Sequence, residues 1–349
     1  MQTRIVSLHR RRPVNICLLY TSRTIRFEAL IFMKNYLAAA LVAFLLSLVF
    51  CLLLIPVLRK LKAGQNILSY VKEHKGKSGT PTMGGLAFVL SAVLAEAVFL
   101  KKFDRVAVVS LTVGFAYLLV GLLDDVLKKK HKENLGLKAW QKALFQTFAA
   151  VFAGLFCVRA GLTTLNLPFT HKSVDIGWGM VPLAVFVFLA TVNSVNLTDG
   201  LDGLAAGTSL PFFLCLGLLI AVQGRFPSLA LLSFCLCGAL AAYLIFNVSP
   251  AAVFMGDTGS LALGGFASCI GVFTGNTLYI AVVGIMFVLS SITVIIQVIY
   301  YKATGGKRVF LMAPVHHHFQ EKGYSEAKIS YAYAVVTAIL GALCVIAQL

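Results

Sequence analysis

Ten long apolar segments constrain the fold of this chain more than any other feature of its sequence. A helix needs about 20 predominantly apolar residues to cross the hydrocarbon core of a bilayer. The apolar runs of these ten segments are too continuous for the alternating pattern of a membrane β-barrel. The sequence therefore predicts an all-α integral membrane protein with about ten transmembrane helices. The segments begin near Leu37, Met83, Val106, Ala143, Met180, Leu204, Leu229, Leu261, Leu278 and Ile329.

The composition agrees with a membrane protein and argues against a nucleic-acid partner. Hydrophobic residues make up 59% of the 349 residues, and charged residues only 12%. A net charge of +17 is large enough to suggest a polynucleotide ligand. The basic residues are sorted by loop, however, and no basic domain with interleaved aromatic residues exists to hold one. We therefore expect no nucleic-acid partner.

The distribution of Lys and Arg predicts the orientation of the spans. Basic residues gather after the first, third and ninth spans, whereas the opposite loops hold few of them. The positive-inside rule places the basic loops in the cytoplasm, so we expect a multi-pass membrane protein with both termini outside. In the outer loop at residues 160–179, Thr164 and Val174 lie among turn formers, which predicts a short periplasmic hairpin.

The first 32 residues do not fit this topology. They carry six arginines on the side that the rule keeps poor in positive charge, and they lack the long apolar core of a signal peptide. We interpret residues 1–32 as an N-terminal extension and residues 33–349 as a single ten-helix domain. The alternative is a basic arm that binds anionic lipid.

Asp199 and Asp202 lie in an unusual loop, NSVNLTDGLDGLAAG, between the fifth and sixth spans. Spaced three apart, they would project from one face of a helical turn. Gly200 and Gly203 let the backbone turn sharply or approach a ligand closely. Nothing purely structural requires two carboxylates and several glycines between two membrane spans, so this loop is a candidate binding site.

Three further aspartates stand at the same ends of spans. Asp124 and Asp125 are adjacent in GLLDDVLKKKHK, where they could simply pair with the lysines or join them in binding an anionic, metal-bearing substrate. Asp257 precedes Thr258 and could either cap a helix or act as a ligand. Convergent carboxylates suit Mg²⁺ or Mn²⁺ holding a diphosphate. Lysines and a metal beside phosphate oxygens are what phosphoryl transfer requires.

Other stretches carry residues suited to a substrate. The segment KGKSGTPTMGG is either a flexible loop with a helix cap or a phosphate-binding loop, although it lacks the Walker order. Asn247 and Phe254 offer an amide and an aromatic face of the kind that recognise a nucleobase. In MAPVHHHFQEKG the three consecutive histidines cannot all point the same way, so a metal site built from all three is not expected.

Together these motifs resemble the phospho-N-acetylmuramoyl-pentapeptide transferase family, within the polyprenyl-phosphate N-acetylhexosamine-1-phosphate transferase superfamily. The motifs are KSGTPTMGG, LLDD, NLTDGLDGLAAG, FNVSPAAVFMGDTGS and FLMAPVHHHFQEKG. The resemblance extends from about Met33 to Leu349. It implies a Mg²⁺-dependent bacterial inner-membrane enzyme, a homodimer with its active site facing the cytoplasm. Such an enzyme transfers phospho-MurNAc-pentapeptide from UDP-MurNAc-pentapeptide to undecaprenyl phosphate, giving lipid I and UMP for peptidoglycan synthesis.

The resemblance also implies roles for individual residues. Asp257 would coordinate Mg²⁺ and act in catalysis together with Asp124 and Asp125. The uridine would be held by Gly200, Leu201, Asp202, Asn247 and Phe254. Further substrate-contacting positions are Lys77, Thr82, Lys128, Lys142, Asn196, Asp199, Gln297, His316 and His317.

The sequence leaves three alternative functions open. A related transferase could use UDP-GlcNAc and would keep the aspartates. A proton-coupled transporter would have its carboxylates distributed through the membrane depth, whereas here they are expected at one face. A catalytically inactive lipid-binding protein could retain every motif.

Overall fold

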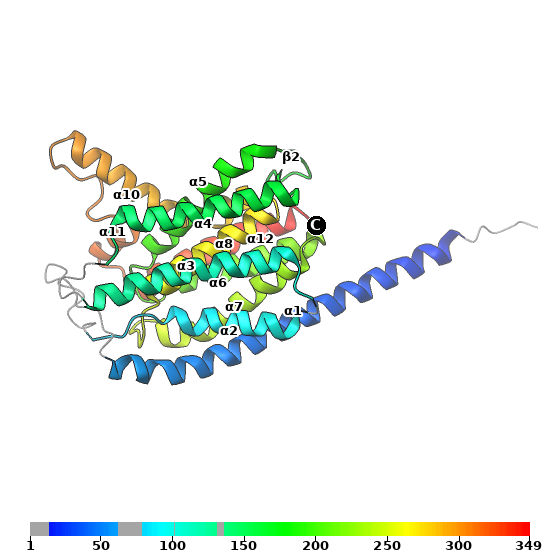
Figure 1. Ribbon diagram of the computed structural model, residues 1–349, viewed down its shortest axis with the longest axis horizontal. Helices are drawn as coiled ribbons and strands as arrows, with labels where there is room; N and C mark the ends of the chain where they lie inside the picture. The colour runs from blue at the N-terminus through cyan, green and yellow to red at the C-terminus, as the bar shows by residue number, and fades with distance from the viewer. Residues whose placement is uncertain (1–13, 62–78, 101, 131–135) are drawn as a thin grey trace, which may run out of the picture.

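The computed structural model describes residues 14–61, 79–100, 102–130 and 136–349, with the backbone alone for residues 14–32. The described chain consists of α-helices, one short 3-10 helix and one two-stranded sheet (Figure 1). In chain order these are α1 (Val14–Lys60), α2 (Gly85–Phe99), α3 (Arg105–Lys130), α4 (Ala139–Ala160), β1 (Thr164–Asn166), β2 (Ser173–Asp175), η2 (Gly177–Gly179), α5 (Met180–Thr198), α6 (Leu204–Gln223), α7 (Pro227–Asn247), α8 (Gly256–Phe273), α9 (Thr277–Val283), α10 (Ile285–Ala303), α11 (Val315–Glu321) and α12 (Glu326–Ile346).

The ten apolar segments all form helices, which confirms the predicted fold class. Eight of the described helices are long and apolar enough to cross a membrane, and α2 is a shorter apolar helix. The ninth segment is divided at Gly284 into α9 and α10. There the chain packs so tightly that a Cβ on Gly284 would lie 2.5 Å from the carbonyl oxygen of Ile280.

Helix α8 forms the centre of the bundle. All 18 of its residues are buried, and α2, α3 and α5 pack around it. Its sequence is rich in Gly, Ala and Ser, and small residues let neighbouring helices approach closely. A Cβ on Gly264 would lie 2.5 Å from the Cα of Val192 in α5. This close packing fixes the N-terminal end of α8 relative to α3 and α5.

Helix α1 is longer than one membrane span. It contains 47 residues, and its N-terminal part projects beyond the bundle (Figure 1). Tyr36 stacks on Phe234 of α7, with ring centroids 5.2 Å apart. At this position, therefore, α1 already packs against the bundle. The boundary expected at residue 32 lies within α1, and the separate origin of residues 1–32 stays a prediction.

The predicted hairpin is present. Strands β1 and β2 are antiparallel, with Leu165 opposite Val174. The Asn166 amide donates to the side-chain oxygen of Asn276 at 3.0 Å, which ties the hairpin to the turn between α8 and α9. The sheet lies at the end of the bundle opposite α11 (Figure 1). The end that carries α11 is called the site end below.

Candidate active site

Three aspartates from two helices meet at the site end. Asp124 and Asp125 lie near the end of α3, and Asp257 lies in the first turn of α8. One carboxylate oxygen from each lies within 4.8 Å of the others, an arrangement that could hold a metal ion. Gly121 makes this approach possible, because a Cβ there would lie 2.1 Å from the carbonyl oxygen of Asp257.

Two lysines neutralise part of this charge. The ammonium group of Lys128, one turn after Asp124 on α3, lies 2.7 Å from Asp124 Oδ2 and 3.2 Å from Asp257 Oδ2. Lys142 of α4 lies 2.9 Å from Asp124 Oδ2 and also donates to Asp257 Oδ2. The carboxylates outnumber the lysines by one. The ion pairs that the sequence left open therefore form on Asp124 and Asp257, and the carboxylate without a lysine partner at these distances is Asp125.

Asp125 differs from the other two because its carboxylate is directed at the start of α8. It accepts hydrogen bonds from the backbone N–H groups of Asp257 (3.2 Å) and Thr258 (3.0 Å), and from the Thr258 hydroxyl (2.6 Å). A carboxylate at a helix N-terminus satisfies free N–H groups and interacts favourably with the helix dipole. Asp125 of α3 thus caps α8, and the capping role considered for Asp257 belongs to Asp125.

Asn196 and Asp199 complete the cluster from the end of α5. The Asn196 amide donates to Asp257 Oδ1 at 3.0 Å and to the Ser260 hydroxyl at 2.8 Å. Asp199 follows one turn later. Burial, together with the nearby carboxylates of Asp257 and Asp125, raises the pKa of Asp199 well above its usual range. Helices α3, α4, α5 and α8 therefore all contribute to one charged cluster.

The PTMGG segment joins α2 to the same place. The Gly84 N–H donates to the carbonyl of Phe254 at 2.9 Å, and the Phe254 N–H donates to the carbonyl of Pro81 at 2.8 Å. Thr82 is buried beside Gly256, where a Cβ would lie 2.5 Å from the Thr82 hydroxyl. Gly256 has φ +69° and meets Asp125 on the same side, so both space and conformation require glycine.

The loop at residues 199–203 packs beside the loop that precedes α8. Asp202 is buried, and its carboxylate accepts a hydrogen bond from the Ala251 N–H at 3.0 Å. Asn247 is also buried and donates to the carbonyl of Val253 at 2.9 Å. Gly203 has φ +72°, which glycine adopts without strain. Asp202 and Asn247, both expected to hold a nucleobase, thus contact the same loop before α8.

The three histidines do not all point the same way, as the sequence predicts. His316 is fully buried and packs against Gly200, where a Cβ would lie 2.6 Å from His316 Nε2. His317 also faces Gly200 and bonds to the Gln320 side chain at 3.0 Å. His318 instead accepts a hydrogen bond from the Leu311 N–H at 3.1 Å.

Comparisons with known proteins identify the family of this chain. The family model described as glycosyl transferase family 4 matches residues 107–275. Signature 1 of phospho-N-acetylmuramoyl-pentapeptide-transferase matches residues 77–89, a range that includes the PTMGG segment.

Curated relatives extend the match to most of the chain. Phospho-N-acetylmuramoyl-pentapeptide-transferase of Bacillus subtilis (strain 168) is 41% identical over 309 residues, covering 86% of this chain and 95% of that protein. The enzymes of the same name from Bacillus velezensis and Geobacillus sp. are 40% and 41% identical, each matched over 95% of its length. The chain belongs to the phospho-N-acetylmuramoyl-pentapeptide-transferase family.

Membership of this transferase family is consistent with the gathering of carboxylates at one end of the bundle. A transporter was expected to have its acidic residues distributed through the membrane depth. Asp124, Asp125 and Asp257 instead form a single group. Of the expected substrate positions, Gln297 holds a neighbouring loop. Gln297 accepts hydrogen bonds from Val309 (3.1 Å) and Phe310 (3.0 Å) and so holds the chain before α11. Lys77 lies outside the described residues.

Two groups that contact the candidate active site were not expected from the sequence. The Leu137 N–H donates to Asp124 Oδ1 at 2.7 Å, a backbone contact that no residue type signals. Glu326, in the first turn of α12, accepts a hydrogen bond from the Asp202 N–H at 2.8 Å. The sequence did offer a sign of Glu326, because an acidic residue stands there directly before the last apolar span.

Acidification is expected to destabilise the protein through His316. Burial, reinforced by His317, lowers the pKa of His316 from 6.5 to about 3. The unfolded chain therefore binds one more proton between these values, so stability falls as pH drops from about 6.5 toward 3. The slope from one proton is at most about 1.4 kcal/mol per pH unit.

Thermal unfolding of the detergent-solubilised protein at pH values from 7.5 to 5 measures this effect. His316→Gln should flatten the dependence of Tm on pH. His171→Gln, at an exposed position between β1 and β2, is the matched control and should leave it unchanged. An unaltered slope in His316→Gln would contradict the assignment.

Proposed function

We propose that this chain transfers phospho-MurNAc-pentapeptide from UDP-MurNAc-pentapeptide to undecaprenyl phosphate, giving lipid I and UMP for peptidoglycan synthesis. The observation that carries the proposal is the cluster of Asp124, Asp257, Lys128 and Lys142 at the N-terminal end of α8. It combines oxygen ligands and ammonium groups, which phosphoryl transfer between phosphates requires. The curated relatives carry the name of this activity.

The donor set fits Mg²⁺. Carboxylate oxygens are the ligands that this ion prefers, and the oxygens of the three aspartates lie within reach of one another. Asp257 and Asp124 would hold the ion, because Asp125 is engaged with the start of α8. Bound there, Mg²⁺ would neutralise charge on the phosphate oxygens.

The remaining groups suit direct in-line attack of the lipid phosphate on the β-phosphate of the nucleotide sugar. Asp124 is bonded on one oxygen by Leu137 and on the other by the two lysines, so it orients Lys128 and Lys142 toward the developing phosphate charge. The competing path makes an aspartate a covalent nucleophile. Mass spectrometry after incubation with nucleotide sugar alone distinguishes the two, since a phosphorylated aspartate would contradict direct attack.

The nucleotide is proposed to bind across the loop at residues 199–203. Gly203 lies beside the carbonyl of Asn247, and Asp202 is bonded to Ala251 of the facing loop; Gly200, Leu201 and Phe254 would complete the seat. Thr82, Asn196 and Asp199 line the side toward the aspartates. His316 and His317 close this loop from α11.

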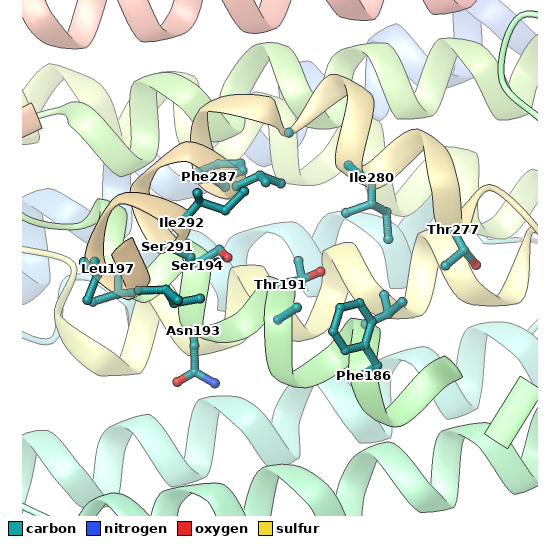
Figure 2. A pocket seen from close by; sticks show the side chains of 17 residues that line it. Phe186, Thr191, Asn193, Ser194, Leu197, Thr277, Ile280, Phe287, Ser291 and Ile292 are labelled. Atoms are coloured by element: carbon teal, nitrogen blue, oxygen red, sulfur yellow. Dashed lines mark hydrogen bonds between the residues drawn. The ribbon is translucent and has the colours of Figure 1, made fainter. Parts of the chain in front are cut away.

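An apolar cavity offers a place for the lipid chain. It measures about 570 Å³ and lies between α5, α9 and α10. Figure 2 shows Phe186, Thr191 and Leu197 of α5 across the cavity from Ile280, Phe287 and Ile292. Among its few polar side chains, Ser194 and Ser291 are bonded to each other at 2.7 Å. The site-end part of α5 continues to Asn196 and Asp199, so a chain in the cavity would direct its phosphate toward the aspartates.

Filling this cavity is expected to weaken binding of the lipid substrate without affecting binding of the nucleotide sugar. Ala190 lines the cavity, and Ala190→Trp would displace several CH₂ groups, each worth about 0.8 kcal/mol when buried. We expect KM for polyprenyl phosphate to rise about tenfold, with KM for the nucleotide sugar unchanged. Ala342→Trp, at an exposed position on α12, is the control. An equal rise in both KM values would contradict the assignment.

The setting proposed for this enzyme is the bacterial inner membrane. The positive-inside rule places the site end in the cytoplasm and both termini outside. The expected homodimer belongs to the same proposal. Cysteine labelling of intact cells at Lys172→Cys in the hairpin and Lys322→Cys after α11 would test the orientation. Both positions are exposed, and only the first should react with an impermeant reagent.

One assay tests the activity itself. The purified protein is incubated with UDP-MurNAc-pentapeptide, polyprenyl phosphate and Mg²⁺, and UMP release is measured. Release that depends on all three supports the proposal. Equal release with UDP-GlcNAc would assign the chain to the related transferases, and absence of release would contradict the proposal.

A further inference from the structure

Helix α12 places one face against the loop at residues 199–203. The four contacting residues are Glu326, Ile329, Ser330 and Tyr333. They have the i, i+3, i+4, i+7 spacing of one helical face. The contacts therefore come from a single rigid element rather than from scattered side chains.

The polar half of this face holds the backbone of the loop at two successive residues. Glu326 Oε2 accepts a hydrogen bond from the Asp202 N–H at 2.8 Å. The Ser330 hydroxyl donates to the Gly203 carbonyl at 2.8 Å. Both groups are backbone groups, so they constrain where the chain runs and hence where the Asp202 side chain is directed.

The apolar half supports the residues on either side of this pair. Leu201 and Leu204 form a small buried cluster with Ile329 and Tyr333, separate from the main core. All four are at most 5% exposed. The loop is therefore fixed to α12 by its own packing as well as by hydrogen bonds.

A second contact connects this face to the histidine segment. Gln320 of α11 donates to Glu326 Oε1 at 3.4 Å, and its oxygen bonds to His317 at 3.0 Å. Glu326 thus contacts both the loop and α11, which encloses Gly200 from the other side.

We propose that Glu326 is a positioning residue for nucleotide recognition, which with Ser330 fixes the Asp202–Gly203 backbone on α12. The inference rests on the proposed function, because the loop at residues 199–203 is taken to seat the nucleotide. The contacts of Glu326 described above reach the nucleotide loop and α11, and Glu326 does not line the cavity, so its loss should weaken binding of the nucleotide substrate and leave binding of the lipid substrate unaffected.

Steady-state kinetics with both substrates varied tests this role. Glu326→Ala should raise KM for the nucleotide sugar about tenfold, as expected for losing a hydrogen bond to a charged group. The kcat and the KM for polyprenyl phosphate should stay within about twofold. Glu326→Gln keeps an oxygen for the Asp202 N–H and should restore most of the affinity. Glu321→Ala, an exposed acid on α11, is the matched control and should behave as wild type.

Calorimetric titration with UMP measures the same effect without turnover. Glu326→Ala should weaken UMP binding by a factor similar to the rise in KM. Ser330→Ala should also weaken UMP binding. The double variant should lose less affinity than the product of the two single fold-changes, because both residues hold the same turn.

The outcomes separate the two proposals. A wild-type protein that neither releases UMP nor binds it overturns the proposed function. An active wild type whose Glu326→Ala variant keeps its KM for the nucleotide sugar overturns the positioning role. A lower Tm with equal losses for both substrates also overturns it, because that pattern reflects general destabilisation.

Discussion

Asp257→Asn is expected to lower UMP release by about a thousandfold, equivalent to about 4 kcal/mol of transition-state stabilisation. The substitution keeps the volume of the side chain, and its oxygen can still accept the hydrogen bond from Asn196. It removes the negative charge, however, and turns an amide N–H₂ group toward Lys128 and Lys142, which both contact Asp257 Oδ2. The variant should therefore fold but lose its ability to hold a cation and to orient the lysines.

Two measurements separate these effects. Electron paramagnetic resonance with Mn²⁺ reports cation binding without turnover, and Asp257→Asn should bind the ion more weakly. Asp175→Asn, on the exposed strand β2, serves as the control and should keep full activity. If Asp257→Asn retained more than about a tenth of wild-type turnover, it would contradict the role of Asp257 as a ligand.

Gly85→Ala is expected to destabilise the whole site end. A Cβ on Gly85 would lie 2.2 Å from the Cα of Gly259 and 2.3 Å from its nitrogen. Backbone atoms cannot move aside as a flexible side chain can, so α2 must separate from α8. Overpacking of this kind costs typically about 1–3 kcal/mol, and here we expect the upper end. The displaced residues adjoin Thr258, which bonds to Asp125, so activity should fall with stability.

A second Gly→Ala variant provides the matched control. Gly179 has φ −60° and ψ −16°, and the nearest atom to a Cβ added there would lie 3.7 Å away. Gly179→Ala should therefore leave Tm within about 1 °C of wild type, since surface changes are usually nearly neutral. Equal Tm values for the two variants would contradict the prediction, because they would mean that a side chain at Gly85 does not lower the free energy of unfolding.

The helices could be predicted because each apolar run is long enough to cross a bilayer, whatever its neighbours are. The composition of α8 was the only hint of its central place, since small residues permit close packing but do not name the partner helix. The interruption at Gly284 was not predicted. It lies within a continuous apolar run, and its close contact with the carbonyl oxygen of Ile280 arises only in the folded chain.

The aspartates were correctly expected to gather, but their separate tasks were not evident. Asp124 and Asp125 are adjacent and chemically identical, yet one pairs with lysines while the other caps α8. That difference arises from the direction of each side chain on α3, which depends on how α3 and α8 cross. The part played by Glu326 was missed for a similar reason, because its partner is a backbone N–H that lies 124 residues away in sequence.

The complete enclosure of α8 separates the reacting groups from changes in the surrounding membrane. A bilayer that is thinner or thicker than average acts on lipid-facing helices, which respond by tilting. Every residue of α8 is covered by protein, and its first turn is held by Asp125, Asn196 and the PTMGG segment. The outer helices can thus adjust to bilayers of different thickness while the arrangement of the aspartates at the start of α8 stays constant.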